Sequence, residues 1–302
     1  MATSVAMSKS KPLAATDVLR PIVHRVSRPG RGPIARLMSP SDLGEILKPF
    51  VFLDFFDSDA TLMGSMPMHP HSGIATVTLI TQGDVRFSDP HAGKGVITYG
   101  GVEWMRAGGG VWHGKEMSRG TSEWLCGFQL WISLPPELEN GPVDSQYLEA
   151  PAIPTAGPAR VILGEHQGFK SPVRSPHGIT YLLVTLAPGQ SWRYQPPPNH
   201  EVLWLSVSQG ALHAQERVEM GTLAIFAKGN AAITLQAHAG SAATFILGSA
   251  VPHPYDLKLG YYSVHTSDQA LQAGEAKIEE IRLRLQSKIA HRDDAEAVPI
   301  FK

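Results

Sequence analysis

Residues His69 to Gly83 read HPHSGIATVTLITQG, and this stretch decides the fold. Thr76 to Thr81 is rich in β-branched residues and ends at the turn signal Gln82-Gly83-Asp84, which predicts a β-strand followed by a tight turn. The first three residues place two histidines at positions i and i+2. Side chains two residues apart on a strand point to the same face, so His69 and His71 are predicted to present two imidazoles together.

A second informative stretch runs from Gly95 to Met117 and reads GVITYGGVEWMRAGGGVWHGKEM. Its short apolar segments are separated by glycines, which is typical of an antiparallel barrel or sandwich. It contains His113, a third histidine that a neighbouring strand can bring to the first two. Three neutral imidazoles suit first-row transition metals such as iron, nickel, copper and zinc. These residues therefore predict a metal site.

Together the two stretches resemble the pirin family, a branch of the cupin superfamily. The matching pieces are HPH-x-G with the β-rich run after it, Gly100-Gly101-Val102, Trp104-Met105, Gly110-Val111-x-His113, and Gly127 to Ser133, which reads GFQLWIS. The resemblance is clear from about Lys48 to Tyr147 and follows only the layout in the C-terminal half. It implies an all-β fold, a bicupin of two antiparallel, jelly-roll-like barrels, here with a short C-terminal helix.

The domain organisation follows from composition. Glu149 to Arg160 reads EAPAIPTAGPAR, a proline- and alanine-rich stretch without periodicity that is typical of a linker. Turn-bounded apolar segments continue after it. We therefore expect a mobile tail over residues 1–18 and an N-terminal cupin barrel with the metal site over residues 19–148. A linker is expected over residues 149–160, followed by a metal-free C-terminal cupin barrel that carries the helix over residues 161–302.

The resemblance implies an iron held by an HxH pair and an HxE pair. His69 and His71 match the first pair and His113 matches the second histidine. The chain departs from the pattern after that, because it reads His113-Gly114-Lys115-Glu116 and the family's glutamate falls at Lys115.

On a regular strand Lys115 would face the metal and Glu116 would face away, and an ammonium beside a dication is costly. A β-bulge at Gly114 would restore the facing of the acid. Glu116 is therefore the predicted fourth ligand, and a three-histidine site or no stable metal are the alternatives. Another acid that pirin-like sequences usually carry is replaced by Ala75, and Glu103 lies in a different strand with a spacing that gives it no special claim.

The second half shows no paired histidines. His200, His213 and His238 are expected to be surface or loop residues, and Trp192, Tyr194 and Trp204 are expected to be core residues. Near the end of the chain, Ser267 can cap a helix. Its apolar face is formed by Leu271, Ile278, Ile281 and Leu285, and Glu280 with Arg284 forms an i, i+4 ion pair. Gly274 weakens the first half of that helix. We expect it to pack across a barrel, and an outward recognition face is the alternative.

Composition excludes several classes of function. Lys plus Arg number 26 and Asp plus Glu 27, so no positive field gathers nucleic acid, and direct nucleic-acid binding is not expected. The single cysteine, Cys126, lies in an apolar run and rules out an intramolecular disulfide, which fits a reducing compartment. No secretory signal and no apolar run of membrane length is found. A cytoplasmic location is expected, or a nuclear one in a eukaryote.

The resemblance implies a metal-dependent dioxygenase that opens the heterocyclic ring of a flavonol such as quercetin with O2. The expected cofactor is one divalent transition metal, Fe(II), with Glu116 as ligand and base for the flavonol hydroxyl. Candidates to face the flat substrate are Phe52, Phe55, Phe56 and Trp112. Two alternatives are a redox-sensing regulator that acts through protein partners and a non-catalytic scaffold.

Overall fold

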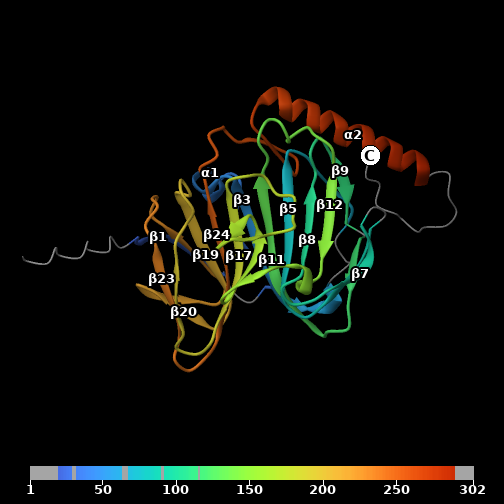
Figure 1. Cartoon of the computed structure of the whole chain (residues 1–302). Coiled ribbons are helices and arrows are strands. Elements are labelled where there is room, and N and C mark those ends of the chain that lie inside the picture. Colours follow the sequence, from blue (N-terminus) through green and yellow to red (C-terminus); the bar gives the residue numbers. More distant parts are fainter. Residues whose placement is uncertain (1–19, 29–31, 63–66, 90–91, 115, 290–302) are drawn as a thin grey trace, which may run out of the picture.

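The computed structural model describes residues 20–28, 32–62, 67–89, 92–114 and 116–289. Two β-barrels stand side by side, and a long helix crosses the end of the first (Figure 1). The fold is therefore all-β with a C-terminal helix, as predicted, although this helix spans 22 residues and is not short.

The first barrel is built on a six-stranded antiparallel sheet. Its strands, in spatial order, are β12 (Asp144–Leu148), β8 (Val102–Arg106), β5 (Ile74–Gln82), β11 (Trp124–Ser133), β3 (Phe50–Asp59) and β2 (Ile34–Met38). Two smaller sheets close it: β10 (Met117–Arg119), β6 (Val85–Asp89) and β7 (Gly93–Ile97), and the pair β4 (His69–His71) with β9 (Val111–His113). Helix α1 (Leu43–Leu47) precedes β3, and the 3-10 turn η1 (Ala60–Leu62) follows it.

The second barrel is built on a seven-stranded sheet. Its strands, in spatial order, are β1 (Ile22–Ser27), β22 (Thr222–Phe226), β19 (Val202–Gln209), β24 (Ala243–Ala250), β17 (Ile179–Leu186), β14 (Ala159–Leu163) and β13 (Thr155–Ala156). A four-stranded sheet covers its other side, with β18 (Ser191–Tyr194), β23 (Ile233–Ala237), β20 (Ala211–Ala214) and β21 (Glu216–Glu219). The hairpin of β15 (Glu165–His166) and β16 (Phe169–Lys170) forms a separate two-stranded sheet.

The two large sheets pack face to face through one apolar core. Alternate residues of β5 point into this core, so Ala75, Val77 and Leu79 are fully buried there, where Leu183 and Trp204 of the second sheet also lie. Phe50 meets Trp204 edge to face, with ring centroids 5.2 Å apart. Because side chains alternate along a strand, the remaining residues of β5 line the inside of the first barrel.

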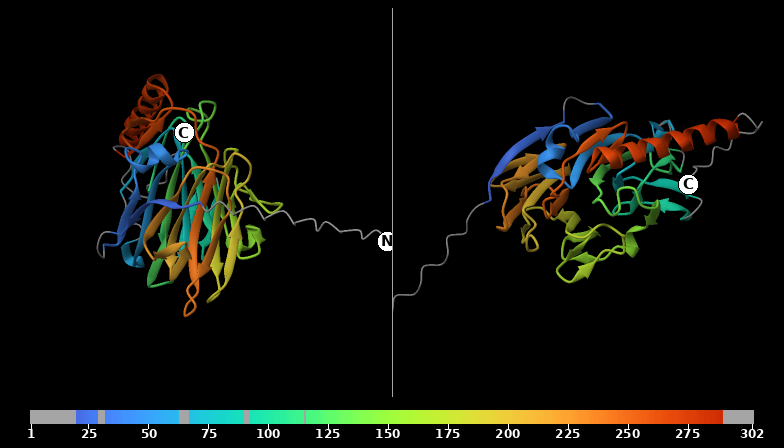
Figure 2. Two further views of the ribbon diagram at one scale, coloured as in Figure 1. Left: turned by 90° about the vertical axis from the view of Figure 1, so that its left-hand side faces the viewer. Right: turned by 90° about the horizontal axis from the view of Figure 1, so that it is seen from above.

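The first strand and the last hairpin of the chain each pack on the barrel formed mainly by the other half of the sequence. Strand β1 falls in the range predicted for the first barrel, yet it pairs with β22 of the second (Figure 2). In the other direction, the hairpin of β25 (Lys258–Gly260) and β26 (Ser263–His265) lies against the first barrel, where Val264 N donates to Ser72 O over 3.2 Å. The predicted linker contains the 3-10 turn η2 (Ala150–Ala152) and β13, which borders the second sheet.

The C-terminal helix α2 (Asp268–Ile289) begins where the sequence predicted. Ser267 Oγ accepts a hydrogen bond of 3.2 Å from Ala270 N, as a capping side chain does. Ile278 and Ile281 are buried, and Ile278 O accepts a 2.9 Å hydrogen bond from the indole of Trp112. A Cβ atom at Gly274 would lie 2.5 Å from His265 Nε2 and 2.6 Å from Ser72 Oγ. This glycine therefore permits the close approach of α2 to the barrel.

Candidate metal centre

Two short strands of the first barrel bring three histidines together. Strands β4 and β9 are antiparallel, and His69 lies directly opposite His113 in their register. His71 follows on the same face of β4. One ring nitrogen from each histidine lies within 4.8 Å of the others, so the predicted three-histidine cluster is formed.

Each of the three imidazoles is held by its Nδ1 atom. His69 Nδ1 lies 2.9 Å from Pro67 O, His71 Nδ1 lies 3.1 Å from Tyr262 O, and His113 Nδ1 lies 2.5 Å from Glu116 Oε1. A carbonyl or carboxylate oxygen fixes Nδ1 as the donor, which leaves the Nε2 lone pair of each ring available. The Nε2 atom of His113 is buried without a hydrogen-bond partner. Such an orphaned acceptor inside a histidine cluster fits a metal ion.

Burial and mutual proximity keep this cluster suited to a cation. Burial lowers the pKa of His71 well below its usual value, and its neighbours His113 and His69 lower it further. Burial also lowers the pKa of His69. Neutral imidazole is the form that binds metal, so these two candidate ligands are in the right protonation state at pH 7. For His113, burial acts in the same direction, but the hydrogen bond and charge of Glu116 outweigh it and raise the pKa.

Glu116 reaches the cluster through a turn and not through a bulge in a continuous strand. Strand β9 ends at His113 and β10 begins at Met117, and Gly114 between them has a φ of 136°. The buried carboxylate accepts from His113 Nδ1 with one oxygen and from Gly114 N, over 2.8 Å, with the other. Although burial raises the pKa of Glu116, these hydrogen bonds and the charge of His113 lower it to about 2. Lys115 lies outside the described residues.

Glu103 lies in the same neighbourhood, which its sequence spacing did not indicate. Together with His113 and Glu116 it forms a second set of donor atoms within 4.8 Å of one another. One Glu103 oxygen accepts from Thr78 Oγ1, which also contacts Gln129 Oε1 at 2.8 Å, and the other oxygen is buried without a partner. Burial raises the pKa of Glu103 to about 7, although the charge of His113 acts against this.

Of the four aromatic residues proposed to face a substrate, Phe52 is connected to the cluster through Trp131. Its ring stacks on Trp131 with centroids 4.0 Å apart, and Trp131 meets the ring of His71 edge-on at 4.9 Å. Phe55 is buried in the core between the barrels, Phe56 packs against an apolar cluster around Ile80, and Trp112 donates to helix α2.

Two aromatic residues of this site were not singled out in the sequence. Trp131 lies within the GFQLWIS stretch, but the sequence did not show that its side chain points towards the histidines. Tyr262 lies in the turn between β25 and β26, and its ring centroid is 5.6 Å from that of His69 and 5.8 Å from that of His71. No local pattern marks Tyr262, because it reaches the site only when the C-terminal hairpin packs on the first barrel.

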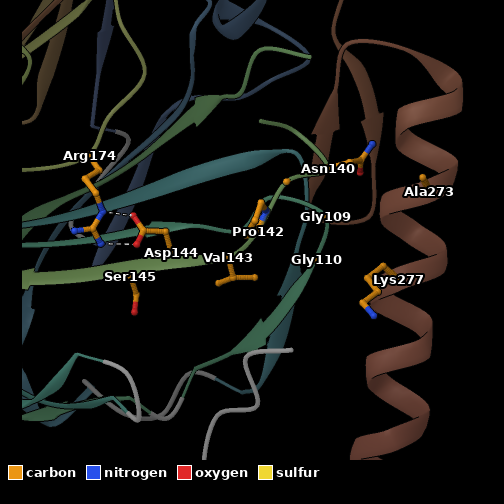
Figure 3. Close-up of a pocket in the computed structure, with 11 residues that line it drawn as sticks. Gly109, Gly110, Asn140, Pro142, Val143, Asp144, Ser145, Arg174, Ala273 and Lys277 are labelled. Atoms are coloured by element: carbon orange, nitrogen blue, oxygen red, sulfur yellow. Dashed lines mark hydrogen bonds and ion pairs between the residues drawn. The ribbon is translucent and has the colours of Figure 1, made fainter. Parts of the chain in front are cut away.

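A groove between helix α2 and strand β12 lies apart from the histidines (Figure 3). Arg174 and Lys277 are its two basic lining residues, and both are paired with carboxylates. Arg174 Nε lies 3.0 Å from Asp144 Oδ2, and Lys277 Nζ lies 2.9 Å from Glu280 Oε2. Among its described lining residues, the groove therefore has no unpaired basic group to attract an anion.

In the described part of the second barrel, no three such donor atoms lie within 4.8 Å of one another. His213 and His238 are exposed, whereas His200 is a buried loop residue whose Nδ1 lies 3.0 Å from Ser249 Oγ. Trp192, Tyr194 and Trp204 are core residues, as predicted. Cys126 is also buried, and burial raises the pKa of its thiol to about 11. Within the described residues no helix is long and apolar enough to cross a membrane.

Comparison with known proteins identifies the family. The pirin family model matches residues 34–132. Pirin-1 of Arabidopsis thaliana is 31% identical over 197 residues, which cover 64% of this chain and 67% of that protein. A Vibrio cholerae protein named "Putative quercetin 2,3-dioxygenase" is 31% identical over 219 residues, 68% of this chain and 77% of that protein. The match to a pirin-like protein of Caulobacter vibrioides, 36% identical, spans half the length of that relative.

Solved structures agree. A quercetin 2,3-dioxygenase from Acinetobacter baumannii superposes with a TM-score of 0.75 at 25% identity and covers 90% of this chain and 98% of that one. A bacterial pirin from Escherichia coli, solved in complex with nickel(II), shares the fold with a TM-score of 0.57 at 18% identity over 78% of this chain and 98% of that one. With its two barrels, its helix and its histidine cluster, the chain belongs to the pirin family.

Proposed function

We propose that this protein is a metal-dependent dioxygenase that opens the heterocyclic ring of a flavonol with O2. The observation that carries the proposal is the histidine cluster, in which three Nδ1 atoms are engaged and three Nε2 atoms remain for one ion. His69, His71 and His113 are the proposed ligands. The names of the Vibrio and Acinetobacter proteins support the substrate class.

Fe(II) is the proposed metal, and histidine and carboxylate donors are compatible with it. When bound, a redox metal with open positions supplies the means to activate O2 and to hold a substrate oxygen. The protein orients the ligands through Pro67 O, Tyr262 O and Glu116, and it places the rings of Trp131 and Tyr262 beside them, where a flat molecule can stack.

Glu116 is proposed to belong to this centre, and its hydrogen bonds support the role of orienting His113. A carboxylate behind a ligating histidine fixes the ring and raises its basicity as a donor. Direct coordination as fourth ligand, and acceptance of the flavonol hydroxyl proton, require the carboxylate to turn away from His113. Both remain predictions.

Oxygen consumption tests the proposal. Protein reconstituted anaerobically with Fe(II) should consume O2 when quercetin is added, and the flavonol absorption band should disappear. The His113→Ala variant should do neither, because it lacks one of the three donors. If metal-loaded protein consumes no O2 with several flavonols, the dioxygenase proposal is wrong, and the regulatory alternative, which acts through protein partners, takes its place.

A further inference from the structure

The turn between β25 and β26 carries a residue in an unfavourable backbone conformation. Tyr262 has a φ of 55°, in the left-handed region where a bulky side chain is an outlier and glycine is at ease. Strain of this kind persists only where the surrounding structure imposes it, and it is often found at functional sites. A tyrosine here is therefore not explained by the needs of the turn.

The hairpin is fixed firmly enough to impose this conformation. Ser72, which directly follows His71, accepts from Val264 N with its carbonyl oxygen and lies 2.9 Å from His265 Nε2 with its hydroxyl. On the other side of the same ring, His265 Nδ1 lies 3.2 Å from Glu139 Oε2. All these polar side chains are buried. Ser72, beside a proposed metal ligand, is thus joined to His265, and its hydroxyl also donates to Ser263 Oγ over 2.9 Å; these partners lie 193 and 191 positions later in the chain.

The main chain and the side chain of Tyr262 do different things. Its carbonyl oxygen accepts from His71 Nδ1 over 3.1 Å, which any residue at this position could provide. The residue is 42% exposed although its side chain is large, and its ring is tilted by 46° to the ring of His69 and by 63° to that of His71. Trp131 lies 6.3 Å away, centroid to centroid, and is itself almost buried. The exposed ring therefore borders the open side of the histidine cluster.

We propose that Tyr262 is a specificity-determining residue, whose ring selects flat aromatic ligands at the metal. This inference deepens the proposed function and rests on it for the metal, but not for the flavonol. A planar ligand that reaches the histidine cluster passes along the Tyr262 ring and stacks against it. A small anion makes no use of that surface. The ring should therefore contribute to aromatic ligands alone.

The test compares two ligands that bind metal. Protein loaded anaerobically with Fe(II) is titrated with 4-nitrocatechol, a flat aromatic chelator, and with azide, a small anion, while the absorption spectrum is followed. Tyr262→Gly removes the ring and keeps the carbonyl. It should weaken 4-nitrocatechol binding roughly three- to ten-fold, the range expected for one aromatic contact, and leave azide binding unchanged. Tyr262→Phe should bind both ligands like wild type.

Two controls separate this role from a structural one. Tyr255→Ala removes another exposed tyrosine of the same segment, whose ring packs on His253, and should affect neither ligand. Thermal unfolding of Tyr262→Gly should begin no earlier than that of wild type, because glycine relieves the strain, whereas a structural role predicts earlier unfolding. Metal content should also be unchanged.

Equal 4-nitrocatechol affinity in wild type and Tyr262→Gly would overturn the inference, as would parallel losses for 4-nitrocatechol and azide. Failure of the wild type to bind 4-nitrocatechol would overturn it as well. The proposed function fails differently: in that case 4-nitrocatechol binds in a ring-dependent way, but no flavonol is consumed.

Discussion

The two barrels share a plan and differ inside. In both, one face of the central strands is apolar and packs against the partner barrel. The opposite face lines the barrel interior. In the second barrel this face carries residues such as Val184, Leu205 and Leu247, all fully buried in a mainly apolar core. In the first barrel the corresponding lining includes Thr78, Glu103 and Gln129, joined by hydrogen bonds.

This difference indicates that the barrels have separate tasks. Burying polar groups costs stability unless every group is paired. In the first barrel Glu103 and His113 each keep one unpaired buried atom, and in the second barrel His166 does so as well. The mainly apolar interior of the second barrel brings no three metal-binding donor atoms together within its described residues. The hydrogen-bonded polar side chains beneath the histidine cluster thus cost the first barrel part of its stability, and we expect the second barrel to brace it.

The largest expected effect separates the barrels by metal content. His71→Ala should abolish stoichiometric metal, because a donor held by Tyr262 O is lost. His200→Ala removes an equally buried histidine, also hydrogen-bonded through Nδ1, from the second barrel and should leave the metal content unchanged. Elemental analysis of the purified variants decides this. An equal metal content in wild type and His71→Ala would show that His71 is not a metal ligand.

The apolar barrel should be the more sensitive to lost volume. Leu205→Ala leaves a cavity in a dry core and should lower the free energy of unfolding by about 2–5 kcal/mol. Leu283→Ala, on the exposed side of α2, should change it by less than about 0.5 kcal/mol. Denaturant unfolding measures both. A small effect of Leu205→Ala would mean that the second barrel does not brace the molecule.

The polar interior should show in the pH dependence of the metal-free protein. The pKa of Glu103 is raised to about 7, mainly by burial, so the folded state keeps this proton at pH values where the unfolded state has lost it. Its contribution to stability is greatest below pH 4.5 and falls as the pH rises to 7, by about 3 kcal/mol at most. Glu103→Gln should weaken the dependence of the unfolding free energy on pH between pH 4.5 and 7. If the free energy of unfolding, measured in the presence of chelator, depends on pH in the same way in wild type and in Glu103→Gln, the effect assigned to Glu103 is absent.

The smallest expected effect is the difference in metal affinity between two variants of Glu116, which distinguishes its possible roles. If the carboxylate orients His113, Glu116→Ala should weaken metal binding about 10–100-fold, and Glu116→Gln, which still accepts a hydrogen bond, should weaken it less. If Glu116 is a direct ligand, both variants should lose affinity alike. Lys115→Ala should have no effect in either case. Competition with a chromophoric chelator measures the affinities.

Sequence reasoning was strongest where function follows local spacing. The HPH pair on one strand face, His113, the capping Ser267 and the turn-bounded strands were all predicted and are present. It failed where distant segments meet. Tyr262 and Glu103 reach the histidines only through barrel closure and hairpin docking, and β1 crosses to the other barrel for the same reason. A spacing rule cannot encode a contact across more than 190 residues.

The histidine cluster can be tested most directly by an anomalous difference map from crystals grown with Fe(II). The account predicts one strong peak about 2.0–2.2 Å from the Nε2 atoms of His69, His71 and His113, the usual length of a metal–imidazole bond. It predicts no peak within residues 161–250. A map without a peak at the three histidines, or with its strongest peak in the second barrel, would contradict the division of labour between the barrels.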